Sequence, residues 1–149
     1  MLNAKLNSNS NSIANLKPQV SINVHKFGGS SLANADCVKR VVGIIKKHAS
    51  LEDLIVVSAN GDTTDSLYAL FNCANNEQFE TAITELQKAQ EQLINELVEG
   101  DRAYLLKNYL QQNLQFIRQQ YTQHTLEENR NDILAFGELW SAKILASVI

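Results

Sequence analysis

The chain has 149 residues, of which 44% are hydrophobic and 19% charged, with a formal net charge of -3. This length and balance fit one soluble globular domain with a buried core, and the charge gives no reason to expect general binding to nucleic acid or to an anionic membrane. No apolar run approaches the roughly 20 residues needed to span a bilayer. The two cysteines, Cys37 and Cys73, lack metal or redox spacing, so we expect them to be small buried residues in a reducing cytoplasm.

The two ends of the chain have unusual compositions. Residues 1–19 are rich in Asn and Ser and lack the apolar core of a signal peptide, so we expect a disordered leader followed by an ordered part over 20–149. The chain stops at Ile149 inside an apolar helical pattern, without a capping residue or a polar tail. We therefore predict that the chain is a fragment of a longer protein or a truncated product.

A strand, a helix and a second strand are predicted between residues 20 and 57. Apolar residues alternate over 20–27, which predicts a β-strand, and recur at helical spacing over 30–49, which predicts a helix. Residues 54–57 are continuously apolar, as is typical of a strand covered on both faces. This order is that of a βαβ unit, so we expect the two strands to be parallel.

The rest of the chain is predicted to be helical. A short helix is expected over 63–74, with Thr or Asp at its start. Residues 77–124 have almost no Gly or Pro and carry leucines at helical spacing, which predicts two helices that break near Gly100. We expect these two helices to form an antiparallel hairpin with glutamine-rich faces in solvent. A last helix is expected to begin near Asn131 and to run to the end of the chain.

The first candidate site follows the first predicted strand. Lys26 stands just before Gly28, Gly29 and Ser30, where the strand is expected to enter a helix. Glycines let a ligand approach the main chain closely, and the unpaired N–H groups of a helix start favour an anion. This turn fits a phosphate site in which the Lys26 ammonium is the dominant charge. The alternative is a tight structural turn beside an exposed lysine.

A second group of polar residues follows the second predicted strand. Ser58, Thr63 and Thr64 lie beyond its carboxyl end, and parallel strands share the edge at which open α/β sheets bind ligands. We expect these hydroxyls to face the same crevice as Lys26 and to hydrogen-bond a carboxylate or phosphate oxygen. The alternative for Thr63 and Thr64 is a helix cap, and for Ser58 a hydrogen bond within its own loop.

Glu138 is the third candidate, on the last predicted helix among apolar residues such as Phe136 and Trp140. A carboxylate in apolar surroundings needs a partner, which could be a cationic substrate group, Lys26 or a helix start. The alternatives are the polar edge of an amphipathic helix and a capping carboxylate. The three histidines have no ligand spacing, and no metal site is predicted on the chain.

These three segments, in this order, resemble those of the aspartate kinases in the amino-acid kinase superfamily. KFGGSS at 26–31 is similar to the family signature K-F-G-G-[ST]-S, and GELWS at 137–141 is similar to its G-E-x-x-S helix. VVSA at 56–59, followed by Thr64, resembles the second loop of the family. The likeness extends over 24–149 and is greatest for the kinase domain of the bifunctional aspartokinase–homoserine dehydrogenases of the methionine branch.

The resemblance implies an α/β fold: the N-terminal portion of a three-layer αβα sandwich of the amino-acid kinase or carbamate kinase type, with an inserted helical hairpin. It implies that ATP and Mg²⁺ are used to phosphorylate L-aspartate to 4-phospho-L-aspartate, the first step toward Lys, Thr and Met. A cytoplasmic location and a homo-oligomeric full-length parent are also implied. The implied roles are phosphoryl transfer for Lys26, phosphate binding for Lys26, Gly28, Gly29 and Ser30, and aspartate binding for Ser58, Thr64 and Glu138.

Complete domains of this family are longer than the ordered part predicted here. We therefore expect little kinase activity from the isolated chain, and aggregation through an unpaired sheet edge and an exposed apolar face of the last helix. Asp62 also departs from the smaller or apolar residue that is common at its position. Two other hypotheses stay open: another amino-acid kinase acting on glutamate, a carbamate or a nucleotide, and a non-catalytic remnant or interaction subunit that docks on a complete kinase.

Overall fold

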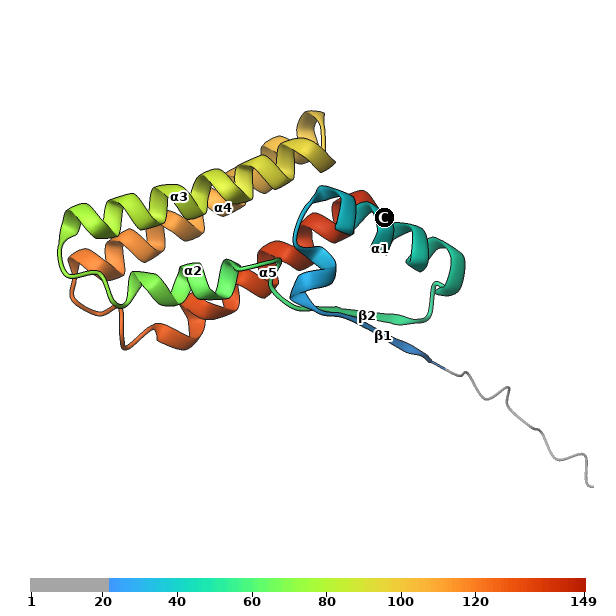
Figure 1. Ribbon diagram of the computed structural model, residues 1–149, viewed down its shortest axis with the longest axis horizontal. Helices are drawn as coiled ribbons and strands as arrows, with labels where there is room; N and C mark the ends of the chain where they lie inside the picture. Colours follow the sequence, from blue (N-terminus) through green and yellow to red (C-terminus); the bar gives the residue numbers. More distant parts are fainter. Residues whose placement is uncertain (1–21) are drawn as a thin grey trace, which may run out of the picture.

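The computed structural model describes residues 22–149, so the leader expected over 1–19 lies outside the described residues. The elements are β1 (Val24–Phe27), a 3₁₀ helix η1 (Gly29–Leu32), α1 (Ala35–His48), β2 (Leu54–Val57), α2 (Thr63–Leu70), α3 (Asn76–Leu97), α4 (Gly100–Thr122) and α5 (Arg130–Val148) (Figure 1). The strands are parallel, with Val24 paired to Leu54 and Phe27 to Val57. The predicted βαβ unit and α/β class are confirmed. No helix of the described range is long and apolar enough to cross a membrane.

The chain does not pass directly from the first strand into the first helix. η1, a four-residue 3₁₀ helix, follows β1, and α1 begins only at Ala35. The side-chain oxygen of Asn34 accepts the N–H of Cys37 at 3.0 Å, the usual cap of an α-helix. The predicted start of the α-helix near Ser30 is therefore wrong. Residues 29–32 form the 3₁₀ turn η1, and the α-helix begins only after its capping residue Asn34.

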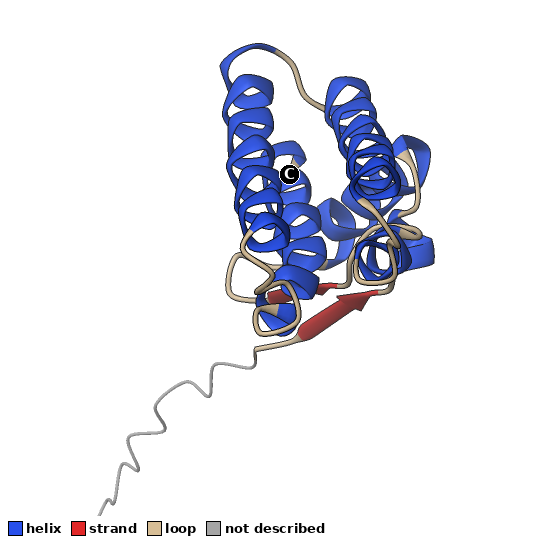
Figure 2. Cartoon of the chain, turned by 90° about the vertical axis from the view of Figure 1, so that its left-hand side faces the viewer, coloured by secondary structure: helices blue, strands red, loops and turns tan. Residues whose placement is uncertain are grey.

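Only one face of the two-stranded sheet is covered by helices. Ile55 and Val57 are half-buried against the helical core, whereas Val24 and Leu54 on the other face are 62% and 57% exposed. Figure 2 shows the strands at one side of the molecule, with the helices stacked on one face of the sheet. The prediction that the second strand is covered on both faces is therefore wrong for this chain. Of the three layers expected, the described residues form the sheet and one helical layer.

We expect the open sheet face to cause self-association, because exposed apolar side chains and unpaired strand edges attract further copies. Leu54→Lys should lower self-association in sedimentation velocity and change the unfolding free energy by no more than about 0.5 kcal/mol, since the side chain is already in solvent. The matched variant Ile55→Lys alters the covered face and should unfold the chain. Equal stability of the two variants would contradict the assignment of the faces.

Helices α3 and α4 form the predicted antiparallel hairpin and lie side by side along their length (Figure 1). The prediction that the glutamines of this hairpin lie in solvent is wrong at two positions, because Gln90 and Gln120 are buried. The amide oxygen of Gln120 accepts from the Thr125 hydroxyl at 2.7 Å and from the Asn129 side chain at 2.8 Å. This buried amide therefore holds the end of the hairpin to the turn before α5.

Helix α5 contacts α1, α2, α3, α4 and β2, so most of its apolar residues are covered. Trp140 and Ile144 are buried, and the indole N–H of Trp140 donates to the side chain of Asn113 on α4 at 2.8 Å. The predicted exposed apolar face of the last helix is thus reduced to separate residues such as Leu139. Exposed apolar residues lie on the open face of the sheet (Val24, Leu54 and Val56), in the turn before β2 (Leu51) and on α4 (Tyr104 and Leu105).

The two cysteines are free thiols. Both are half-buried rather than fully buried as predicted. Partial burial raises the pKa of the Cys73 thiol, which lies 3.4 Å from the carbonyl of Ala69. Cys73 is therefore a weakly acidic thiol just beyond the end of α2.

Asp53 ties the start of β1 to the turn before β2. Its side chain is 1% exposed, and its carboxylate accepts the N–H groups of Ser50 at 2.9 Å and Asn23 at 3.1 Å. Nε2 of His25 lies 3.1 Å from Oδ2, the same oxygen that accepts from Ser50. The backbone hydrogen bonds from Ser50 and Asn23, followed by that of His25, hold the pKa of the Asp53 carboxyl well below its usual range.

We expect the stability of this fold to depend on pH through Asp53. Because the pKa of this carboxyl is lower in the folded chain, its ionised form stabilises the fold above about pH 4 and this contribution is lost as the pH falls below that value. Asp53→Asn should therefore lower the thermal unfolding midpoint at pH 7, and the difference from the unaltered chain should shrink toward pH 3. Circular dichroism at several pH values measures both midpoints. A difference that stays constant from pH 7 to pH 3 would show that the carboxylate is not the stabilising form.

Candidate functional site

The turn after β1 carries the first group of predicted site residues. Lys26 is exposed on the open face of the sheet, and η1 begins just beyond it. Ser31 donates its N–H to the carbonyl of Gly28 at 3.0 Å, whereas no carbonyl within residues 22–149 accepts from the N–H of Gly29 or Ser30. An ammonium and two available N–H donors therefore lie together in one short segment, as an anion site requires.

A 3₁₀ helix of four residues aligns few peptide dipoles, so the charge at this turn comes from Lys26. A lysine ammonium about 4 Å from a phosphate oxygen gives about 4 kcal/mol at an effective dielectric of about 20, before desolvation. A helix end gives about 0.3–1 kcal/mol. The turn can therefore hold an anion through one cation and oriented N–H groups, rather than through the helix start that the sequence suggests.

Gly29 packs directly against the loop that follows β2. A Cβ atom on Gly29 would lie 2.7 Å from the carbonyl oxygen of Ala59, so a side chain does not fit there. The N–H of Gly61 donates to the carbonyl of Gly29 at 3.1 Å, and Gly61 has a φ of 52°, which glycine adopts without strain. Backbone contacts thus join the first predicted segment to the second.

The same alanine also contacts α5. A Cβ atom on Gly137 would lie 2.9 Å from the Cβ of Ala59 and within 3.5 Å of the side chains of Leu67 and Thr63. Gly137 is buried, so α5 crosses the loop at this point without an intervening side chain. The segment around Glu138 on α5 therefore contacts Ala59 in the loop after β2, and the same residue contacts Gly29 in the turn after β1.

The predicted side chains border this three-way contact without all touching one another. The N–H of Ser58 donates to the carbonyl of Phe27 at 3.1 Å, which places Ser58 at the carboxyl end of β1. Ser58 and Thr64 are half-buried, and Glu138 is exposed on α5. None of the ion pairs within residues 22–149 joins Lys26 to Glu138. The structure thus brings together the backbones of the turn after β1, the loop after β2 and α5, and it leaves the side chains of Lys26 and Glu138 in solvent.

Glu138 is not surrounded by apolar side chains, which corrects the prediction. Each residue of an α-helix is turned by about 100° from the previous one, so neighbours in sequence lie on different faces. Gly137, Trp140 and Ser141 face the core of the molecule, whereas Glu138 faces solvent. The carboxylate therefore needs no buried partner and is accessible to a cationic group of a ligand.

Two buried polar residues beside the site form a hydrogen-bonded pair. Thr63 is 5% exposed and donates its hydroxyl to the carbonyl of Asn60 at 2.6 Å. It lines a pocket beside α3 together with Asn60 and Gln90, and Lys26 does not line this pocket, so the predicted crevice shared with Lys26 is not the one that Thr63 borders. The same hydroxyl accepts from the side-chain amide of Gln90 at 2.8 Å. Sequence reasoning missed Gln90, although its place in the apolar period between Leu86 and Leu93 predicts a buried position.

The donors at the turn after β1 suit phosphate oxygens rather than a metal ion, because an ammonium and N–H groups donate hydrogen bonds and supply no ligand for a cation. In the described part of the chain, no three His, Cys, Asp or Glu side chains gather closely enough to hold a metal ion. A nucleotide phosphate therefore fits the available residues.

Comparison with known proteins identifies the family. The sequence profile of the amino acid kinase family matches residues 21–149. Bifunctional aspartokinase/homoserine dehydrogenase 2 of Escherichia coli is 29% identical over 128 residues, which cover 85% of this chain and 16% of that protein. Bifunctional aspartokinase/homoserine dehydrogenase 1, chloroplastic, of Arabidopsis thaliana is 30% identical over 133 residues, which cover 85% of this chain and 15% of that protein. The chain thus spans about a sixth of the length of these relatives.

The crystal structure of E. coli aspartokinase III in complex with aspartate and ADP has the same fold over most of this chain. The TM-score is 0.73 at 21% identity, over 86% of this chain and 28% of that one. The likeness to the aspartate kinases noted in the sequence is confirmed, as is the conclusion that the described residues form part of the fold. Because the family profile covers nearly the whole chain, this protein belongs to the amino acid kinase family.

Proposed function

We propose that this chain is part of an aspartate kinase domain, which transfers the γ-phosphoryl group of ATP to the side-chain carboxylate of L-aspartate. A carboxylate oxygen attacks the γ-phosphorus, the bond to the bridging oxygen breaks, and ADP leaves, giving 4-phospho-L-aspartate. The names of the relatives support this substrate, since they are aspartokinases. The single observation that carries the proposal is the contact of Gly29 and Gly137 with the same residue, Ala59.

Lys26 and the turn after it would hold the nucleotide phosphates. The Lys26 side chain is exposed, and the available N–H groups of Gly29 and Ser30 follow it within four residues, so all three can approach oxygens that gain negative charge during transfer. Gly28 would bring its backbone to the same phosphates. Mg²⁺ would enter with the nucleotide, because magnesium is commonly held by substrate phosphates and one or two carboxylates.

Ser58, Thr64 and Glu138 would bind the aspartate. The two hydroxyls are half-buried next to the carboxyl end of the sheet, where they can donate to a carboxylate oxygen. The exposed carboxylate of Glu138 can accept from the α-ammonium of the substrate. Cation and carboxylate would thus act on different partners, the phosphates and the amino group, which explains why no ion pair between them is needed.

Single substitutions should separate nucleotide binding from aspartate binding. Lys26→Ala should raise the dissociation constant for ADP with Mg²⁺ about tenfold, a loss of about 1.4 kcal/mol, and leave that for L-aspartate unchanged. Glu138→Gln should weaken aspartate about tenfold and leave the nucleotide unchanged. Titrations of the ¹⁵N-labelled chain followed by NMR measure both constants, and Lys46→Ala at the end of α1 is the control for loss of a lysine.

The outcomes decide between this proposal and its alternatives. Equal weakening of both ligands by Lys26→Ala would contradict its role, and an unchanged aspartate affinity in Glu138→Gln would remove that residue from the site. Preference for glutamate or a carbamate over L-aspartate would indicate another amino-acid kinase. If neither ligand shifts any resonance, the chain is an interaction subunit or a non-catalytic remnant, for which the open sheet face with Val24 and Leu54 would be the contact surface.

We expect phosphoryl transfer by the isolated chain to be slight, because it spans about a sixth of the length of its relatives. Trapping of the acyl phosphate with hydroxylamine would measure it. The cytoplasm is the expected compartment and a homo-oligomer the expected state of a complete enzyme.

A further inference from the structure

Gln90 connects the helical hairpin to the loop that follows β2. It lies in the middle of α3 and is 2% exposed. Its Nε2 donates to the Thr63 hydroxyl at 2.8 Å, and that hydroxyl donates to the carbonyl of Asn60 at 2.6 Å. One buried amide on the hairpin therefore reaches, through a single hydroxyl, the backbone of the segment from Ser58 to Thr64, called the Ser58–Thr64 loop below, whose last two residues begin α2.

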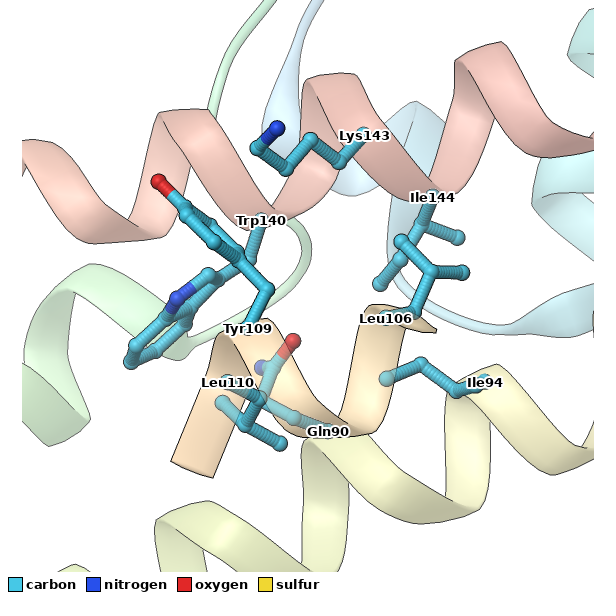
Figure 3. A pocket seen from close by; sticks show the side chains of 8 residues that line it. All are labelled: Gln90, Ile94, Leu106, Tyr109, Leu110, Trp140, Lys143 and Ile144. Atoms are coloured by element: carbon cyan, nitrogen blue, oxygen red, sulfur yellow. The ribbon is translucent and has the colours of Figure 1, made fainter. Parts of the chain in front are cut away.

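The other end of the same amide has no partner within residues 22–149. Its oxygen points into a small cavity of about 10 Å³ between α3, α4 and α5, whose lining includes Leu106, Tyr109 and Trp140 (Figure 3). This space admits about one water molecule, and its walls are mostly apolar. A buried carbonyl without a protein partner must either hold a single ordered water in this small space or forgo a hydrogen bond, and both cost free energy relative to bulk water.

A leucine or methionine at this position would fill the cavity without that cost. The benefit of the amide must therefore lie at its other end, where its N–H group holds Thr63. From the side of the sheet, the loop is held by the Ser58 N–H on Phe27 and the Gly61 N–H on Gly29, both at 3.1 Å, and within the loop the Thr63 N–H donates to Asn60 at 3.1 Å. Gln90 is the contact that fixes the loop from the side of the hairpin.

We propose that Gln90 is a positioning residue, which holds the Ser58–Thr64 loop in the conformation that binds aspartate. This inference rests on the proposed function for the role of the loop. Ser58 lies two residues before Asn60 and Thr64 directly after Thr63. The hydrogen bond from Gln90 to Thr63, and that from Thr63 to Asn60, therefore restrain the backbone between the two substrate hydroxyls. Through them, the α3–α4 hairpin sets the geometry of a site to which it contributes no direct ligand.

The variant Gln90→Met tests this role. It removes the N–H donor and the unpartnered oxygen together and keeps a side chain of similar length. We expect an unfolding midpoint in urea equal to or higher than that of the unaltered chain, amide hydrogen exchange at Gly61 and Thr63 at least fivefold faster, and an L-aspartate dissociation constant raised three- to tenfold. Binding of ADP with Mg²⁺ should not change, because the turn after β1 is intact.

The chain offers a matched control in its second buried glutamine. Gln120 has its amide oxygen satisfied by Thr125 and Asn129 at the end of the hairpin, away from the loop. Gln120→Met should lower the unfolding midpoint and leave both loop exchange and aspartate affinity unchanged. Thr63→Val removes the acceptor of the same hydrogen bond, so it should also speed amide exchange in the loop. It replaces Gln90→Met as the test if Gln90→Met does not fold.

The readouts separate this inference from the proposed function. Exchange at Gly61 and Thr63 that stays within twofold of the unaltered chain in both Gln90→Met and Thr63→Val would overturn the positioning role. Faster exchange with unchanged aspartate affinity would also overturn it, because the loop conformation would then not matter for binding. If the unaltered chain binds no aspartate, the proposed function fails, and the exchange measurement alone decides whether Gln90 orders the loop.

Discussion

Replacing Gly29 with alanine is expected to destabilise this fold by about 2 kcal/mol, whereas the same change at the adjacent Gly28 is expected to leave stability unchanged or slightly raised. The added Cβ at Gly29 would lie 2.7 Å from the carbonyl oxygen of Ala59, and this oxygen belongs to the backbone and cannot rotate away. At Gly28 no described atom lies within 4 Å of the added carbon, and its φ of -78° suits alanine. Packing thus excludes a side chain at Gly29, whereas neither packing nor backbone conformation requires glycine at Gly28.

Urea unfolding of the two variants, followed by circular dichroism, measures this difference. Gly29→Ala should also reduce nucleotide affinity, because the turn after β1 must move away from the loop to accommodate the new carbon. Any effect of Gly28→Ala on nucleotide binding, with stability retained, would be direct support for a phosphate at its backbone. If both variants are as stable as the unaltered chain, the turn and the loop do not pack as closely as described.

Replacing Gly137 with alanine should also destabilise the chain, although alanine is the better helix former. Alanine gains about 1 kcal/mol of helix propensity over glycine, but overpacking costs about 1–3 kcal/mol. The added Cβ would lie 2.9 Å from the Cβ of Ala59, so α5 and the loop would have to separate. We expect a net loss of about 1 kcal/mol and weaker aspartate binding, since Glu138 and the loop hydroxyls would move apart.

Gly43 provides the matched control, because it lies within α1, is exposed, and has no described atom within 4 Å of an added Cβ. Gly43→Ala should stabilise the chain by about 1 kcal/mol through helix propensity alone. The difference between the two variants in urea unfolding is thus expected to be about 2 kcal/mol, the cost of crowding at the three-way contact. Similar gains at both positions would mean that α5 does not cross the loop at Gly137.

Regular elements could be predicted from the sequence because their periods are local. The helical spacing over 77–124 predicted the hairpin formed by α3 and α4, and the apolar residues 54–57 coincide with β2. The pair of glycines after the first strand predicted room for a ligand phosphate, whereas the structure gives Gly29 another role, the close contact with the Ala59 carbonyl. Each of these predictions depends on residues that lie near one another in sequence.

The errors arise where the environment of a side chain depends on distant residues. Glu138 has apolar neighbours in sequence yet is exposed, because α5 turns a different face to the core. Gln90 and Gln120 look like surface residues by type, yet both are buried by helices that pack from elsewhere. The second strand has a sequence suited to burial on both faces, but one face has no helical layer within residues 22–149.

The sequence by itself determined the βαβ unit, the hairpin and the three segments that resemble the motifs of the family, since hydrophobic period and glycine placement act over a few residues. Only the tertiary structure decided that Gly29, Ala59 and Gly137 meet, and that Gln90 holds the loop between two candidate ligands of the substrate. These contacts join residues that are tens of positions apart in the sequence. Close packing allows them only where glycine leaves room for the neighbouring backbone or where a buried polar group is hydrogen-bonded.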